Sequence, residues 1–157
     1  MSNSAQREQL IKHLKGGEAF MPLEHFIDDI PFEKLGERPQ NLPYSFYELS
    51  YHIVFAQKDI LEFSIYEDYK TSKWPDDYWP KESAPQTEEA WEKLKKNYFD
   101  DRDTLKNFIL DVDNDLNHPV KNSEEHTLLR EILLVVEHTA YHTGQMLIIL
   151  RLLGLYK

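Results

Sequence analysis

The stretch from Tyr44 to Tyr69 contains neither proline nor glycine, and this uninterrupted length restricts the possible folds more than any other feature. Its apolar residues recur at spacings of three and four: Phe46, Leu49, Ile53, Ala56, Ile60 and Phe63. This spacing is typical of one face of an amphipathic helix. It predicts a helix that begins near Pro43 or Tyr44, ends near Tyr69 and is about 40 Å long at 1.5 Å per residue.

Prolines and glycines divide the rest of the chain into further helical segments. We expect helices over residues 4–15, 87–112 and 123–153, and a short helix over residues 22–29. Thr87 and Ser123 are the expected N-caps, because each precedes acidic residues that suit the positive end of a helix. Glycine is expected to end the first helix at Gly16 and the last at Gly154.

The segment from Thr71 to Pro85 predicts a long loop, because its three prolines forbid a regular helix. It carries Trp74, Tyr78 and Trp79, which could line a substrate entrance or cover one end of the fold. No segment alternates like a strand. The predicted fold is therefore all-α: residues 1–157 form one domain, an antiparallel four-helix bundle with an additional short helix and a long aromatic loop.

Composition and charge exclude several functions. The net charge of −10 disfavours nucleic acid as a partner, because nucleic acids bind basic surfaces. The absence of cysteine excludes disulfides, thiolate metal ligands and a cysteine nucleophile. The apolar run from Met146 to Leu150 is far too short to span a bilayer, and the polar start lacks a signal sequence. We expect a cytoplasmic protein with no membrane partner.

The chemistry of the chain concentrates on its last predicted helix. His138 and His142 are four residues apart, so both imidazoles lie on one face, one turn apart. Helical zinc sites use this spacing. Glu131 and Gln145 are each seven residues from His138 and extend the same polar stripe. Burying these imidazoles in an otherwise apolar helix is costly unless something satisfies them, and a metal ion would do so.

His52 lies in the middle of the long predicted helix and could complete this pair from a neighbouring element. Three neutral imidazoles suit zinc, nickel, iron or copper. Glu48 and Asp59 share its face and could orient the rings, although acidic side chains on a helix are more often solvated. A pair of surface histidines or a set of core histidines would show the same spacing in the sequence, so the spacing leaves these alternatives open.

Three motifs in order resemble the DinB-like (DinB/YfiT) superfamily of metal-binding four-helix bundles. They are LPYSFYELSYHI with AQKDIL at residues 42–61, KWPDDYWP at residues 73–80, and residues 128–154. The resemblance implies a three-histidine metal site at His52, His138 and His142. The chain has Thr139 and Thr143 where the common family motif has other residues, and neither is expected to disturb metal binding.

The resemblance also implies functions. The family includes enzymes that use low-molecular-weight thiols such as bacillithiol and mycothiol, as well as stress-linked proteins, and its members often form homodimers. We expect a divalent transition metal, zinc or nickel before iron or manganese, with an open coordination position. The candidate activities are thiol S-transferase and hydrolase on a small-molecule substrate or thiol, with Gln145 and Tyr141 as candidate catalytic residues. The alternative is a non-catalytic metal-binding bundle that acts as a stress-related sensor, ligand carrier or interaction module.

Overall fold

A computed structural model describes residues 2–156 of the chain. Within them lie four α-helices: α1 (Ser2–Lys15), α2 (Phe46–Ile65), α3 (Glu88–Leu110) and α4 (Leu128–Leu152). Three short 3₁₀ helices follow α1: η1 (Leu23–His25), η2 (Phe32–Lys34) and η3 (Pro39–Asn41). This part of the chain contains no strand, which confirms the all-α prediction. None of its helices has the length and apolar character needed to cross a membrane.

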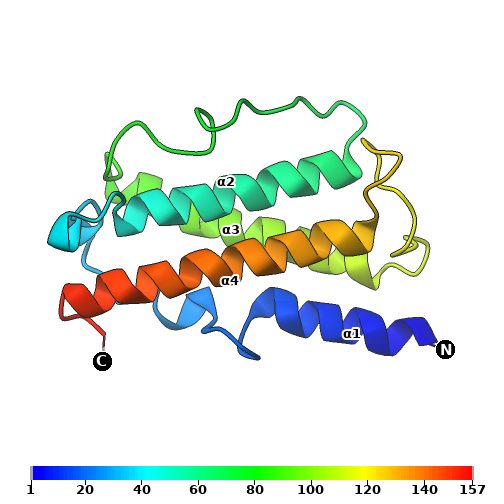
Figure 1. Cartoon of the computed structure of the whole chain (residues 1–157), viewed down its shortest axis with the longest axis horizontal. Coiled ribbons are helices and arrows are strands. Elements are labelled where there is room, and N and C mark those ends of the chain that lie inside the picture. Colours follow the sequence, from blue (N-terminus) through cyan, green and yellow to red (C-terminus); the bar gives the residue numbers. More distant parts are fainter. Residues whose placement is uncertain (1, 157) are drawn as a thin grey trace.

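The four helices lie side by side (Figure 1). Helix α2 packs against α3 and α4, and α1 packs against the same two helices. Helix α4 runs antiparallel to α2, whereas α2 and α3 run in the same direction. Residues 66–87 form the long connection that returns along α2 to the start of α3. A crossover connection of this kind allows neighbouring helices to lie parallel, whereas short loops join antiparallel ones.

Helix α2 begins with a capping box at Ser45. The Ser45 side chain accepts a hydrogen bond from the Glu48 backbone N–H, and the Glu48 carboxylate accepts one from the Ser45 backbone N–H at 2.6 Å. Two donors of the helix terminus are thereby satisfied. The predicted start is close to the observed one, but the predicted end at Tyr69 is wrong, because the backbone becomes extended at Tyr66.

Helix α4 begins at Leu128, later than predicted. Ser123, the expected N-cap, instead accepts hydrogen bonds from the backbone N–H groups of Glu125 and His126 and so closes a turn. Thr127 is the actual N-cap and accepts from the Arg130 backbone N–H. At the other end, Gly154 follows the helix with a φ of 73°, a conformation that glycine adopts without strain.

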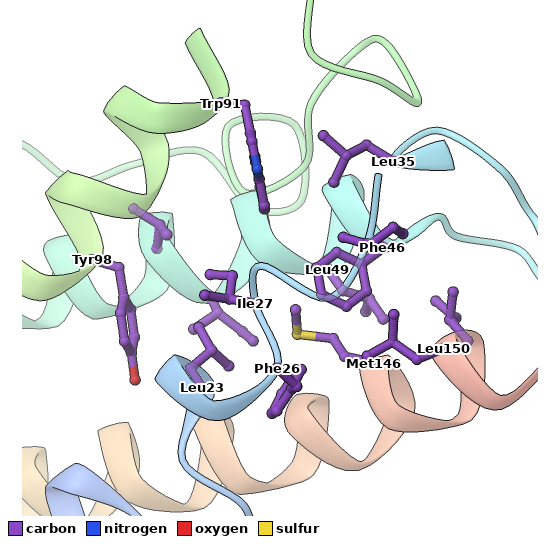
Figure 2. Packing of buried hydrophobic residues seen from close by; sticks show 14 residues of the cluster. Leu23, Phe26, Ile27, Leu35, Phe46, Leu49, Trp91, Tyr98, Met146 and Leu150 are labelled. Atoms are coloured by element: carbon purple, nitrogen blue, oxygen red, sulfur yellow. The ribbon is translucent and has the colours of Figure 1, made fainter. Parts of the chain in front are cut away.

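The core consists of two clusters of buried side chains along the helices. The first, shown in Figure 2, joins Phe46 and Leu49 of α2 to Met146 and Leu150 of α4, with Leu23 and its neighbours packed between them. The second lies toward the other end of the bundle, between α1, the end of α2, α3 and the start of α4. Burial of this apolar surface fixes the α2–α4 seam, along which the histidines lie.

Candidate metal centre

The structure brings together the three histidines that the sequence predicts as ligands. His52 lies on α2, and His138 and His142 lie one turn apart on α4. The Nε2 atoms of His52 and His138 are 2.9 Å apart, and the His138 and His142 ring centroids are 4.5 Å apart. Each ring offers one nitrogen, and the three nitrogens lie within 4.8 Å of one another. His52 and His142 are buried and His138 is half-buried.

Two of the rings are oriented by hydrogen bonds at their far nitrogens. The Nδ1 atom of His52 lies 3.1 Å from the Tyr78 carbonyl oxygen, and Nδ1 of His142 lies 2.6 Å from Oε1 of Gln145. Because these oxygens only accept hydrogen bonds, both Nδ1 atoms carry the proton and donate it. The Nε2 lone pairs of both rings are therefore available for a metal ion, as in metal sites whose ligands are oriented by neighbouring groups.

All three imidazoles are held in the neutral form. Burial lowers the pKa of His138 to about 3, and the neighbouring His142 and His52 add to this effect. Burial also lowers the pKa values of His52 and His142, although the hydrogen bonds to Tyr78 and Gln145 work in the opposite direction. Neutral imidazole is the form that binds metal ions, so the group needs no deprotonation at neutral pH.

The donor set and its spacing fit a transition-metal ion. Zinc–nitrogen bonds of about 2.0–2.1 Å at tetrahedral angles place ligand nitrogens roughly 3.3 Å apart. The Nε2 atoms of His52 and His138 are 2.9 Å apart, which is shorter than this spacing. A small movement of the two side chains would bring them to it. The group contains three histidines and no carboxylate among residues 2–156. Three imidazoles suit zinc, nickel, iron or copper and leave coordination positions for other ligands.

The aromatic side chains of the loop cover His52. The Trp79 ring stacks on the His52 ring with centroids 4.1 Å apart and planes within 7°. Trp74 and Tyr78 lie at centroid distances of 6.1 and 6.4 Å from the same ring. The loop therefore packs over the histidines in the α2–α4 seam, rather than over one end of the bundle.

The polar residues singled out in the sequence have different surroundings. Gln145 contacts His142 directly and orients its ring. Tyr141 is 66% exposed, and its ring lies 4.9 Å from that of His142. Glu48 does not orient His52, because its carboxylate caps α2 and pairs with Arg38.

Asp59 acts on the site through the loop. Its carboxylate accepts hydrogen bonds from the hydroxyls of Tyr69, Ser72 and Tyr78, at 3.0, 2.8 and 2.6 Å. It thereby ties the loop to α2 through Tyr78, whose backbone carbonyl accepts the hydrogen bond from His52. The sequence gives no sign of this role of Tyr78, because the acceptor is a backbone atom.

A pocket of about 350 Å³ opens beside His52 and His138, between α2, α4 and the loop. Ile60 and Phe63 are half-buried: they pack against the second core cluster and also line this pocket. The loop contributes the aromatic rings of Tyr69, Trp74 and Tyr78 to the pocket walls. Helix α4 contributes Glu131, which lies two helical turns from His138. A small molecule in this pocket would lie next to the histidine nitrogens.

These features define a class of protein: a helical bundle with a three-histidine group that could hold a metal ion beside an apolar pocket. Comparison with known families places the chain more closely. The DinB superfamily profile matches residues 18–146, so the chain belongs to the DinB superfamily. No curated protein and no solved structure gives a significant match to the chain.

Proposed function

We propose that this protein is a metal-dependent enzyme that transfers a small thiol to an electrophilic substrate. The observation that carries the proposal is the convergence of three neutral imidazoles beside a pocket large enough for a small molecule. A divalent ion held by His52, His138 and His142 would lower the pKa of a thiol and so supply a thiolate nucleophile. Zinc and nickel are the metals we expect first.

Other residues of the chain orient the ligands, exclude water and hold the electrophile. The Tyr78 carbonyl and the Gln145 side chain hold two of the ligands in the required tautomer. Trp79 covers one face of His52 and keeps water from it. The pocket holds the electrophile beside the nucleophile, where sulfur forms the new bond as the leaving group departs, and the thiol proton passes to solvent.

Hydrolysis is the second candidate activity, since an open coordination position also lowers the pKa of water. Thiol transfer is favoured because the pocket walls are mostly apolar and aromatic, which suits an electrophile more than a reaction that requires bulk water. The alternative of a non-catalytic sensor, ligand carrier or interaction module would need the same histidines but no exchangeable position beside them.

Metal content and thiol binding test the proposal. Elemental analysis of the purified protein is expected to give about one transition-metal ion per chain, and none in the triple variant His52→Ala/His138→Ala/His142→Ala. The variant His118→Ala is the control, because His118 is exposed and lies outside the group.

The cobalt(II)-loaded protein then distinguishes an enzyme site from a closed one. Addition of β-mercaptoethanol is expected to produce a sulfur-to-cobalt charge-transfer band, because the site has room for a thiolate. S-transfer assays with aromatic electrophiles follow. A cobalt spectrum that no thiol alters would contradict the thiol transferase and favour the non-catalytic alternative.

A further inference from the structure

Polar groups line the pocket beside the histidines at two levels along α4. His52 and His138 lie at one end, and Glu131, Arg130 and His126 line the other. Since α4 rises 1.5 Å per residue, Glu131 lies about 10 Å along the helix from His138. The walls between the two ends are apolar, formed by Ala56, Ile60, Phe63 and Leu134.

The distant end of the pocket is negatively charged. Asp59 and Glu131 contribute two carboxylates and Arg130 contributes one guanidinium, while His126 adds a charge only when it is protonated. The Glu131 side chain is only 3% exposed, whereas that of Arg130 is 49% exposed. Charges shielded from water act more strongly than solvated ones, so the buried carboxylate determines the potential inside the pocket more than the half-solvated guanidinium does.

Glu131 also has an oxygen with no protein partner. Its Oε1 atom accepts from Nη1 of Arg130 at 2.5 Å and lies 3.3 Å from Nδ1 of His126. Its Oε2 atom has no hydrogen-bond partner among residues 2–156. This oxygen is not fully enclosed by the protein, so it is accessible from the pocket, and a ligand cation that donates to it would form a charge-assisted hydrogen bond. Asp59, in contrast, already accepts from three hydroxyls.

Aromatic rings line the pocket and favour the binding of a cation there. Trp74 and Tyr78 pack edge to face with centroids 5.1 Å apart, and Phe63 and Tyr69 do the same at 5.4 Å. All four line the pocket. Faces of aromatic rings carry negative charge density, and they attract cations that have left water.

We propose that this pocket binds an alkylammonium molecule. Its charged nitrogen donates to Oε2 of Glu131, its apolar chain lies against Ile60 and Leu134, and its other end reaches His52 and His138. The pocket assignment stands on the carboxylates and the aromatic walls alone. Only the role of the bound molecule as a substrate rests on the proposed function, in which its far end meets the reacting sulfur.

The metal-free protein allows a test that is independent of metal chemistry. Octylammonium, octanol and octanoate share one chain and differ only in the charge of the head group. Their binding is measured by titration calorimetry and by tryptophan fluorescence, to which Trp74 in the pocket contributes. Octylammonium is expected to bind about tenfold or more tightly than octanol, and octanoate most weakly. Equal binding of the three probes, or a preference for octanoate, overturns the proposal.

Matched variants test whether Glu131 is the residue that gives the preference for octylammonium. Glu131→Gln is expected to remove the preference for octylammonium, whereas Glu125→Gln, which changes the same charge at an exposed position, retains it. Circular dichroism melts confirm that each variant is folded. Leu134→Trp fills the pocket without changing charge and is expected to weaken all three probes. Unchanged binding in folded Glu131→Gln or in Leu134→Trp overturns the proposal.

Aminothiols link the pocket to the histidines. With the cobalt(II)-loaded protein, ω-aminooctanethiol is expected to produce the sulfur-to-cobalt band at a concentration at least about tenfold lower than ω-mercaptooctanol does. If β-mercaptoethanol and both longer thiols leave the spectrum unchanged, the proposed function fails, while the octylammonium result still decides the pocket. If all three thiols produce the band and the ammonium group gives no advantage, the ammonium site fails and the proposed function stands.

Discussion

At the scale of single residues, the site depends on acceptors that hold histidine protons in place. Gln145 illustrates this best, because its Oε1 atom lies 2.6 Å from Nδ1 of His142. The sequence suggests this residue as a catalytic candidate, since it shares the polar stripe with His138. In the structure it contacts His142, one of the three candidate ligands, so we expect its effect to appear first in metal affinity.

We expect Gln145→Leu to weaken metal binding by about 10- to 100-fold, because His142 loses the acceptor that fixes its tautomer. Competition with a chromophoric chelator measures the affinity for zinc. Gln86→Leu, at an exposed position on the loop, is the control and should bind zinc as the parent does. Equal affinities in the two variants would show that Gln145 does not orient His142.

A second residue-scale prediction concerns Asp101, whose Oδ2 atom is buried without a hydrogen-bond partner in the described part of the chain. Burial raises the pKa of this carboxyl above its ordinary value of 3.8. The unfolded chain therefore ionises at lower pH than the folded one. The fold loses stability as the pH rises from about 3.8 through the raised pKa.

Asp101→Asn removes this loss, because the amide cannot ionise. We expect it to raise the free energy of unfolding at pH 7 by about 0.5–1 kcal/mol, a value reduced for solvent screening of the half-buried group. Urea titrations at pH 7 and pH 4 measure the difference, which should shrink at the lower pH. The exposed Asp113→Asn should show no such gain, and a gain of equal size there would reject the explanation.

At the scale of elements, one carboxylate of α2 makes three of the hydrogen bonds that hold the loop of residues 66–87 against this helix. Asp59 accepts hydrogen bonds from Tyr69, Ser72 and Tyr78, and the backbone carbonyl of Tyr78 in turn accepts one from His52. One side chain thus connects the position of a long segment to the orientation of a ligand. Loss of Asp59 should therefore have two effects, on the loop and on the metal.

We expect Asp59→Ala to speed tryptic cleavage at Lys70 and Lys73 and to weaken zinc binding by about tenfold. Limited proteolysis followed by mass spectrometry locates the cuts, and chelator competition gives the affinity. Asp68→Ala, at an exposed position in the same loop, is the matched control. If cleavage accelerates while zinc affinity stays unchanged, Tyr78 holds His52 without help from Asp59.

The elements also show why sequence reasoning reaches only part of the site. Spacing predicts α2, the histidine pair on α4 and the partner His52, because periodicity determines which face each residue occupies. The start of α4 is missed because Ser123 caps a turn as readily as a helix. The Tyr78 carbonyl is missed because a backbone acceptor leaves no trace in residue type. The pocket depends on how the loop lies across α2, which local spacing does not specify.

At the scale of the whole molecule, the exposed apolar side chains are concentrated on α4. Leu133, Tyr141, Ile148 and Leu152 are each more than 40% exposed, and their spacings place them on one side of the helix. Such a surface is unusual in a chain with a net charge of −10. We propose that a second copy of the chain packs against this side of α4, as the family resemblance leads us to expect.

Light scattering after size-exclusion chromatography tests this proposal. The parent is expected to have the mass of two chains, and Ile148→Glu to have the mass of one, because a charge buried in the contact is strongly unfavourable. Val112→Glu, at a position that is 80% exposed on the loop after α3, should leave the mass unchanged. A parent with the mass of one chain at all concentrations would reject the dimer.

The crossover between α2 and α3 bears on how such a protein can diversify. Helix α2 has 20 residues and is about 30 Å long, a distance that roughly nine extended residues can span. The connection of residues 66–87 is much longer than this, so most of it is not needed to join the helices. Its surplus length forms the cover of the histidines and one wall of the pocket. Insertions and substitutions there can change which molecules enter while the scaffold of helices and ligands stays the same.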